Sequence, residues 1–320
     1  MDTSHRVRSI ISFVQTATTG SFAAAARTLG VSAAAVSKNV AGLEKSLGIR
    51  LLNRTTRAIQ LTEEGELFLR KARIAIDALN TAVDTVSASH GEPHGKVRIS
   101  TSVAFGREQL MPLLPGLLSR YPGITVTVDF DDRVTDLVRD GYDIALRGGH
   151  VRDSALISRP VCRLNTVLVA TPTYLSTHGV PSTIAEISGH RLIARRFLSG
   201  IVDTWSFLGC DGSIITLDPT DIATLILSAP EAVVEASLSG VGIAQVPVHL
   251  AWPQLISGRL KIVMHEQHHP GPYEMTIQYP HRALIASRVS AVVDYLLKSF
   301  STNEAIHVPL ESLKKYSAVQ

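Results

Sequence analysis

The stretch Phe22–Leu47 constrains the fold of this chain most, because it predicts two short helices joined by a very tight turn. Apolar residues recur at helical spacing on one face of each helix. Gly30 follows the first helix, where a chain often needs a left-handed residue. The Ser21 hydroxyl can cap the first helix and the Ser32 hydroxyl the second. The small Ala26 and the branched Val36 suit two helices that cross closely. The pattern is typical of a helix-turn-helix, with an ordinary helical hairpin in a bundle as the alternative.

Further motifs surround this stretch. They are SF at Ser21–Phe22, AA-R-LG ending at Gly30, VS at Val36–Ser37, LE at Leu43–Glu44, LG at Leu47–Gly48, L-NRT at Leu52–Thr55 and LTEEG at Leu61–Gly65. In this set the chain resembles the N-terminal domain of LysR-type transcriptional regulators, and a looser resemblance extends to about residue 300. The resemblance implies that residues 1–60 form a winged helix-turn-helix that binds double-stranded DNA.

Residues 1–60 also concentrate the positive charge of the chain. They carry eight Arg and Lys side chains against two acids, a net charge of +6, whereas the whole chain of 320 residues carries +3. The remaining residues therefore sum to −3. A basic N-terminal domain on a nearly neutral body indicates a polyanionic partner for that domain alone.

We expect the second helix of the motif to enter the DNA major groove by its N-terminal half. Ile49–Leu61 predicts a small β-hairpin, the wing, with two arginines at its tip, where a solvated loop is the alternative. Arginine suits phosphate because it offers paired donors in a plane. Ala33 and Ala34 depart from the polar residue or proline usual in the family, and can pack on thymine methyl groups. The predicted DNA-binding residues are Ser32, Ala33, Ala34, Ser37 and Lys38 at the bases, and Arg54 and Arg57 at phosphates.

Residues 61–89 predict a long helix that links this domain to the rest. Thr62 offers a capping hydroxyl, and glutamates follow at the positive helix end. This helix suits pairing with a second helix, or packing on its own domain, and the resemblance implies a dimerisation helix. Residues 90–95 are the predicted hinge. Apolar residues step along the helix as in a heptad seam at Phe68, Ala72, Ala75, Leu79, Ala82 and Val86.

From residue 96 onward, predicted strands alternate with helices, which indicates βαβ units and a parallel sheet. This pattern resembles the family's α/β effector domain, whose two lobes are like those of periplasmic solute-binding proteins. It predicts a first lobe of residues 96–162 and 268–300 and a second lobe of residues 163–266. Residues 301–320 form a C-terminal tail without an assigned role. The expected strands include Val97–Thr101, Ile124–Phe130, Asp143–Arg147, Val161–Ala170, Arg191–Phe197, Ile214–Leu217, Val241–Val246, Leu260–Val263 and Tyr273–Tyr279.

Ligands of open α/β lobes bind where strands end and helices begin. Thr101 and Ser102 lie at such a point, and their hydroxyls suit an anion. The resemblance implies that Ser102 and Asp131 occupy effector-contacting positions, although an acid at Asp131 argues against a simple carboxylate effector. Other strand ends, and a predicted capping box from Ser228 to Glu231, extend the site, with ordinary loop and capping roles as the alternative. The predicted effector-binding residues are Thr101, Ser102, Asp131, Arg147, Arg196, Phe197, Ser228 and Pro247.

Other classes of protein receive little support. The segment His265–His269 matches the zinc motif HExxH, but a predicted strand precedes it and Pro270 follows, so we expect a solvated loop. Cys162 and Cys210 lie too far apart for the redox pair of peroxide-sensing family members, and buried free thiols are expected. We expect no cofactor, no metal and no enzymatic activity. Neither a membrane span nor a signal peptide is recognisable, which favours a cytoplasmic protein.

The sequence thus predicts a ligand-responsive, sequence-specific DNA-binding regulator of transcription. A small-molecule effector of unknown identity in the cleft between the lobes is expected to shift the geometry of a homo-oligomer, either a dimer or a tetramer. RNA polymerase is a further candidate partner. The alternatives are a small-molecule-binding protein whose N-terminal domain serves assembly only, and an α/β enzyme, for which the chain offers no convergent acid–base or nucleophile set.

Overall fold

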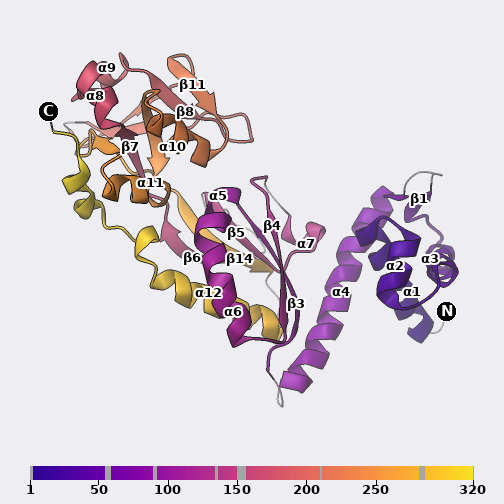
Figure 1. The fold of residues 1–320 in the computed structure, drawn as a ribbon. Coiled ribbons are helices and arrows are strands. Elements are labelled where there is room, and N and C mark those ends of the chain that lie inside the picture. The colour runs from indigo at the N-terminus through magenta and orange to yellow at the C-terminus, as the bar shows by residue number, and fades with distance from the viewer. Residues whose placement is uncertain are drawn as a thin grey trace. The chain divides into compact units, whose positions relative to one another are not determined.

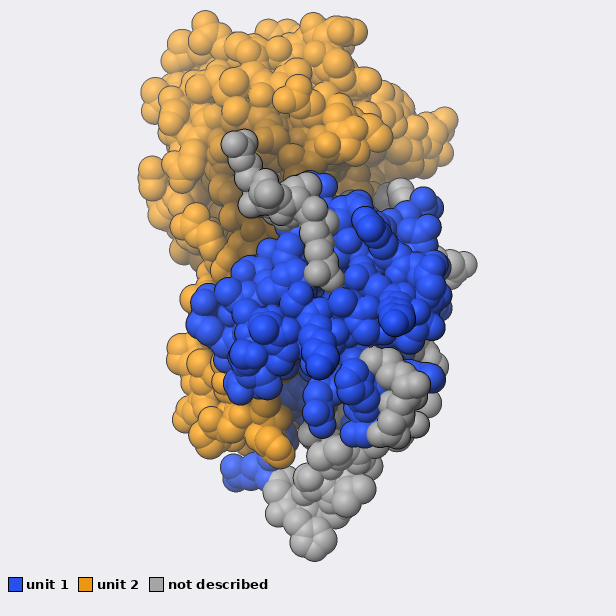
Figure 2. All heavy atoms as spheres, turned by 90° about the vertical axis from the view of Figure 1, so that its right-hand side faces the viewer, with its two compact units in different colours: residues 1–93, 136–143, 282–290 blue, residues 94–135, 144–281, 291–320 orange. Residues whose placement is uncertain are grey.

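The computed structural model describes residues 3–54, 59–88, 92–133, 136–149, 156–209, 211–280 and 285–319. The chain divides into two compact units, coloured differently in Figure 2. The first comprises Met1–Pro93 with the internal segments Asp136–Asp143 and Arg282–Ser290, and the second comprises the rest. In these described ranges, no helix is both long and apolar enough to span a lipid bilayer.

The first unit is a winged helix-turn-helix that continues into a long helix, as predicted. Its largest core cluster buries Phe13, Val40, Leu43, Leu51 and Leu69, which join the first and third helices to the hairpin and the long helix. The predicted wing tip is Arg54–Arg57; residues 55–58, which include Arg57, lie outside the described residues. The elements are α1 (Thr3–Thr19), α2 (Phe22–Leu29), α3 (Ala33–Leu47), β1 (Leu52–Arg54), β2 (Ile59–Leu61) and α4 (Glu63–Ala88), with the short α7 (Leu137–Asp140) from the internal segment.

The predicted heptad seam of α4 divides into two parts. Phe68 packs edge-on against Phe13, with 5.5 Å between ring centroids, and Ala72 is buried. This first part therefore packs on its own domain. Further along, Ala75 is exposed and Leu79 is 55% exposed. The side chains of Ala82 and Val86 lie outside the described residues.

The first lobe of the second unit is built on a five-stranded mixed sheet (Figure 1). Strand β3 pairs in parallel with its two neighbours, whereas β14 runs antiparallel to β5 and β6. The prediction of a parallel sheet is right for two of the four strand pairings, those of β3. The two pairings of β14 are antiparallel, because β14 enters this sheet after the chain has passed through the other lobe. In sheet order the strands are β4 (Ile124–Phe130), β3 (Gly95–Thr101), β5 (Ile144–Gly149), β14 (Glu274–Pro280) and β6 (Leu156–Arg163).

The helical segment after β3 is divided into four short pieces. Pro112 and Pro115 lack the N–H that continues an α-helix, and they lie where the helix type changes. Phe105 and Phe300 are buried there, with ring centroids 5.6 Å apart. The pieces are α5 (Val103–Phe105), a π-helical turn (Gly106–Leu110), a 3₁₀ turn (Met111–Leu113) and α6 (Leu114–Arg120), and the last helix of the lobe is α12 (Ser287–Ser301).

The second lobe has its own five-stranded sheet, with fully buried strands at its centre. The predicted single strand Val161–Ala170 is wrong, because the chain leaves β6 of the first sheet and enters β7 of the second within that range. A hairpin of β9 (Trp205–Leu208) and β10 (Ile214–Leu217) packs beside the sheet, with Trp205 fully buried. The sheet order is β11 (Ala223–Leu227), β8 (Leu192–Arg195), β12 (Ile243–Pro247), β7 (Thr166–Ala170) and β13 (Lys261–Val263), and the helices are α8 (Pro172–His178), α9 (Ile184–Ile187), α10 (Pro230–Leu238) and α11 (Val248–Ile256).

The C-terminal tail is an ordered part of this lobe. It forms two 3₁₀ segments, Glu304–Ile306 and Leu310–Tyr316. Leu313 is fully buried in the core of the lobe, and the Ala318 N–H donates to the Ile262 carbonyl of β13 at 2.8 Å. The tail thus lies beside the outermost strand of the second sheet.

Acid is expected to destabilise the second unit partly through His249. This α11 residue is 9% exposed, its ring lies 5.8 Å from that of Phe105, and burial lowers its pKa to about 4. An unfolded histidine has a pKa of about 6.5, so the folded state binds the proton less readily and stability is lost as the pH falls from 6.5 toward 4. At 1.36 kcal/mol per pH unit the loss is up to about 3 kcal/mol.

Denaturant unfolding between pH 4 and pH 7.5 measures this effect. His268 acts in the same direction, because burial lowers its pKa to about 3. The His249→Leu variant should therefore lose only the His249 part of the pH dependence. An unchanged pH slope in this variant would contradict the prediction.

Candidate functional site

The helix-turn-helix is held by the caps that the sequence predicts. The Ser21 and Ser32 hydroxyls accept hydrogen bonds from Ala24 N at 3.4 Å and Ala35 N at 3.2 Å, at the starts of α2 and α3. Gly30 adopts a φ of 65°, a left-handed conformation that disfavours any residue with a Cβ. At the crossing of the helices, Ala26 and Val36 are buried together. The angle between α2 and α3 is therefore fixed by close packing of small side chains.

One face of α3 is left to solvent at its N-terminal end. Ser32, Ala33, Ala34 and Lys38 are exposed there, and Ser37 is half-buried. No acid lies in the first turn, so the positive end of the helix dipole is uncompensated by side chains. The structure thus places all five predicted base-contacting residues on one exposed helix end.

The wing is tied to α3 by one carboxylate. The Glu44 Oε1 atom accepts hydrogen bonds from Leu51 N at 2.9 Å and Leu52 N at 3.1 Å, where β1 begins. Arg54 ends β1, and its side chain, like Arg57, lies outside the described residues. The roles of both arginines at phosphates therefore stay predictions.

In the second unit, the parallel strands of both sheets end where the chain crosses between the lobes. Gly149 at the end of β5 pairs with Glu274, which also pairs with Arg163 at the first crossing. In the second lobe, Pro247 at the end of β12 pairs with Thr166, the first residue of β7. The carboxyl ends of parallel strands thus lie toward the crossings in each lobe, the usual ligand-binding position in such folds.

The first lobe brings four predicted effector residues to this edge. Thr101 is buried, and its carbonyl accepts from Asp131 N at 2.9 Å. Ser102 precedes α5, but its hydroxyl makes no capping bond. Instead, the Asp132 carboxylate accepts from Val103 N at 3.0 Å. An acid of the chain itself therefore occupies the place predicted for a bound anion.

The other two residues of this group are held by charged or polar neighbours. Arg133 binds the Asp131 carboxylate, with Nη2 2.8 Å from Oδ2, and this hydrogen bonding lowers the Asp131 pKa. The Arg147 guanidinium donates to Ser100 Oγ at 2.6 Å. Asp131 is therefore ionised and already paired, which strengthens the objection to a simple carboxylate effector at this position.

The second lobe places three predicted residues at strand ends. Arg196 N donates to Leu227 O at 2.7 Å, so Arg196 and Ser228 lie side by side, both exposed. Pro247 ends β12 and precedes α11. The predicted capping box is wrong, because α10 begins at Pro230 and the preceding residue is Ala229, with no side-chain cap. Proline fixes the first helical turn one residue later than Ser228 requires.

The structure shows two charged residues that the prediction missed. Arg195, not Arg196, is the more buried arginine at the end of β8: it is half-buried, and its guanidinium lies 4.7 Å over the Phe197 ring. Burial lowers its pKa, while Asp203 and then Asp132 of the first lobe oppose that change. Within the described residues, Arg195 Nε and Glu231 Oε2 are buried without hydrogen-bond partners. Strand alternation places Arg195 and Arg196 on opposite faces, but it shows which one points inward only if the end of β8 is known.

A chain of polar side chains extends from Arg195 toward the second crossing. The Asp203 carboxylate lies 3.4 Å from Gln245 Nε2 and 3.4 Å from the Tyr273 hydroxyl. Gln245 Oε1 lies 2.8 Å from His268 Nε2, and burial lowers the His268 pKa to about 3, so neutral His268 donates. Burial raises the Asp203 pKa, while the charge of Arg195 opposes that rise. The cluster links the cleft edge to the crossing segment.

Comparison with known proteins assigns both units. Residues 7–66 match the model of the bacterial regulatory helix-turn-helix protein, lysR family, and residues 90–301 match that of the LysR substrate binding domain. The chain belongs to the LysR family of transcriptional regulators. It therefore carries the DNA-binding domain and the effector-binding domain of that family, as predicted.

Individual LysR-family members match along nearly the whole chain. The transcriptional regulator CrgA of Neisseria meningitidis is 31% identical over 292 residues, covering 91% of this chain and 96% of CrgA. The regulator DmlR of Escherichia coli is 31% identical over 304 residues, covering 94% and 95%. The solved CrgA structure has a TM-score of 0.60 at 29% identity, covering 92% of this chain and 99% of that structure.

Two other sequence features can be placed within this LysR-family fold. The HExxH match at residues 265–269 lies in turns after β13 and not on a helix, so the prediction of a non-helical segment is confirmed. The loop is only partly solvated, because His268 is buried. In the part of the chain that is described, no cluster of three or more His, Cys, Asp or Glu could hold a metal ion. Cys162 is a buried free thiol whose pKa burial raises to about 12, while Cys210 lies outside the described residues. A reactive thiolate at Cys162 is therefore disfavoured.

Proposed function

We propose that this LysR-family member reads a specific operator with the exposed N-terminal end of α3. Ser32, Ala33, Ala34, Ser37 and Lys38 meet base edges in the major groove, and the wing arginines Arg54 and Arg57 hold phosphates. The observation that carries this proposal is the exposed, acid-free start of α3, set in a domain of net charge +6. Two alanines at the helix start favour contacts to thymine methyl groups and recognition of DNA shape.

The proposed effector site is the cleft between the two lobes. Its first wall contains Thr101, Ser102, Asp131 and Arg147, and its second contains Arg196, Phe197, Ser228 and Pro247. To these we add Arg195 and Glu231, because a ligand that entered the cleft could satisfy their partnerless buried atoms. Since Asp132 already accepts the hydrogen bond from Val103 N and Asp131 already binds Arg133, the first wall has few donors left for an anion, and the second wall is the better place for one.

The effector is proposed to act by shifting the lobes and so changing the geometry of the oligomer. The exposed residues Ala75 and Leu79 of α4 support pairing with a second copy, which places two recognition helices on one operator. A dimer or tetramer of this kind is proposed to work in the cytoplasm, where its DNA is, with RNA polymerase as a further partner.

Paired substitutions test the DNA-binding proposal. Lys38→Ala removes a proposed base contact and should weaken binding to the operator about 10–100-fold, with little change on random DNA. Arg54→Ala removes a proposed phosphate contact, so it should weaken binding to both and reduce the log–log salt slope by about 0.9. Fluorescence anisotropy across a salt series, on the fragment found by footprinting upstream of the protein's own gene, gives both quantities.

Arg259→Ala is the matched control, since this basic residue lies in the second unit. It should bind DNA like the wild type. The proposal fails if the protein selects no DNA fragment even at low ionic strength. It also fails if Lys38→Ala and Arg54→Ala bind the operator as tightly as Arg259→Ala does. In either case the N-terminal unit would serve assembly only.

A further inference from the structure

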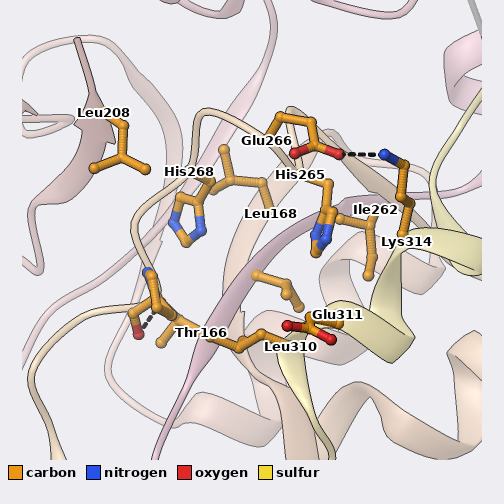
Figure 3. Close-up of a pocket in the computed structure, with 12 residues that line it drawn as sticks. Thr166, Leu168, Leu208, Ile262, His265, Glu266, His268, Leu310, Glu311 and Lys314 are labelled. Atoms are coloured by element: carbon orange, nitrogen blue, oxygen red, sulfur yellow. Dashed lines mark hydrogen bonds and ion pairs between the residues drawn. The ribbon is translucent and has the colours of Figure 1, made fainter. Parts of the chain in front are cut away.

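A pocket of about 380 Å³ lies in the second lobe beside β7 and β13 (Figure 3). Thr166 in its lining is the strand partner of the predicted effector residue Pro247. Four segments form it: the start of β7, the end of β9, β13 with the crossing segment after it, and the C-terminal 3₁₀ segment. None of the eight predicted effector residues lines it. Its lining includes the apolar Val167, Leu168, Leu208, Ile262, Pro270 and Leu310 and the polar Thr166, His265, Glu266, His268, Glu311 and Lys314.

The wall supplied by the C-terminal segment is anchored in the fold. Leu313 is fully buried, and Ala318 bonds to β13. Lys314 Nζ lies 2.9 Å from Glu266 Oε1, which joins the tail to the crossing segment. The match to the family's substrate-binding domain ends at residue 301, so this wall lies beyond the region that the family model describes.

The charges of the pocket do not cancel. Glu266 and Lys314 neutralise each other as an ion pair. His268 is neutral, because burial lowers its pKa to about 3. The Glu311 carboxylate is exposed, and no hydrogen bond or ion pair to another described residue holds it. The pocket therefore presents one uncompensated negative charge next to apolar side chains.

Figure 3 shows His265 and Glu311 on one side of the pocket and Thr166 and His268 on the other, with apolar side chains between them. A volume of this size accepts a small organic molecule. We propose that the pocket is a second ligand site, separate from the cleft, for a molecule with an apolar body and a protonated amine. The amine donates to the Glu311 carboxylate, and the apolar body packs on Leu208 and Leu310, the exposed apolar side chains of the lining.

The location gives this site a route to regulation. Thr166 N and Oγ1 donate to the Pro270 carbonyl at 2.9 and 3.1 Å, so the pocket touches both crossings between the lobes. From His268, a chain of hydrogen bonds extends through Gln245 to Asp203. A ligand here therefore contacts the segments that must bend if the lobes move, and it shifts that equilibrium by its difference in affinity for the two states.

Calorimetric titration of the full-length protein with phenethylamine tests the site, with phenylacetate as the anion of similar shape. At pH 8 ordinary histidines are uncharged while the amine stays protonated. Phenethylamine should bind and phenylacetate should not. Glu311→Gln should weaken the amine about tenfold or more, since a hydrogen bond to a charged group is lost. Glu235→Gln, which removes an exposed acid of α10 outside the pocket, is the control and should bind normally.

Leu208→Trp provides an independent test, because Leu208 is 44% exposed and a larger ring there fills the pocket without disturbing a core residue. This variant should keep the wild-type circular dichroism spectrum and lose amine binding. The proposal is overturned if phenethylamine does not bind, if phenylacetate binds as tightly, or if Glu311→Gln and Leu208→Trp both retain wild-type affinity.

Discussion

Replacing Gly65 with alanine is expected to destabilise the DNA-binding unit by about 3 kcal/mol or more. Gly65 lies in the first turn of α4, and a Cβ there would stand 2.0 Å from Leu51 O and 2.9 Å from Leu51 C. Both atoms are backbone at the start of the wing, so no side-chain rotation relieves the clash. Overpacking of this kind costs about 1–3 kcal/mol or more.

The direction of the stability change distinguishes the clash with Leu51 from the usual effect of alanine in a helix. In an exposed helix, Gly→Ala stabilises by about 0.5–1 kcal/mol, because alanine is the better helix former. The contact with Leu51 should reverse that sign. Thermal unfolding should show a lower first transition and weakened DNA binding for Gly65→Ala. Glu64→Ala, at an exposed neighbouring position, should leave both nearly unchanged. A stabilised Gly65→Ala variant would show that Leu51 does not approach α4 this closely.

Leu79→Glu is expected to dissociate the proposed dimer and to weaken operator binding by about 100-fold or more. Leu79 is 55% exposed on α4, and Leu67 and Ile74 of the same helix are also exposed. Burying one leucine contributes about 1.5–3 kcal/mol, and a symmetric dimer buries it twice. The substitution removes that gain and also brings two like charges together in the interface.

Sedimentation and anisotropy measure the two consequences separately. Ile256→Glu is a suitable control, because Ile256 is 58% exposed on α11 of the second lobe and receives the same charge. It should remain dimeric and bind DNA normally. If the Leu79→Glu protein stays dimeric, the dimer interface lies on another surface. If it becomes a monomer with full operator affinity, one operator does not need two recognition helices.

The N-terminal domain was largely predictable because its signals are local. Caps at Ser21 and Ser32 and the glycine turn at Gly30 depend on neighbours a few residues away, and all are confirmed. One signal there was ambiguous. The period of the α4 seam could not separate Phe68, which packs on Phe13, from Leu79, which is exposed.

The second unit was harder, since its sheets depend on pairing between distant segments. The apolar run around residues 161–170 gave no sign that the chain leaves one sheet and enters another after Arg163. The hairpin partner β9 and the strand β11 have short or weakly alternating patterns. The half-buried arginine at the cleft edge, Arg195, was missed for a related reason, because the choice between Arg195 and Arg196 requires the exact end of β8. Burial of a charge is a tertiary property that a strand pattern does not contain.

The tail beside β13 determines where the chain can be truncated without exposing an aggregation-prone surface. An outer strand whose backbone groups are unpaired can join strands of other molecules. Here the Ala318 N–H covers the Ile262 carbonyl, and Leu313 fills the adjoining core. Cutting the chain at residue 301, where the family match ends, removes that cover and opens a void. Such a fragment should form aggregates at concentrations where the full-length protein stays dispersed.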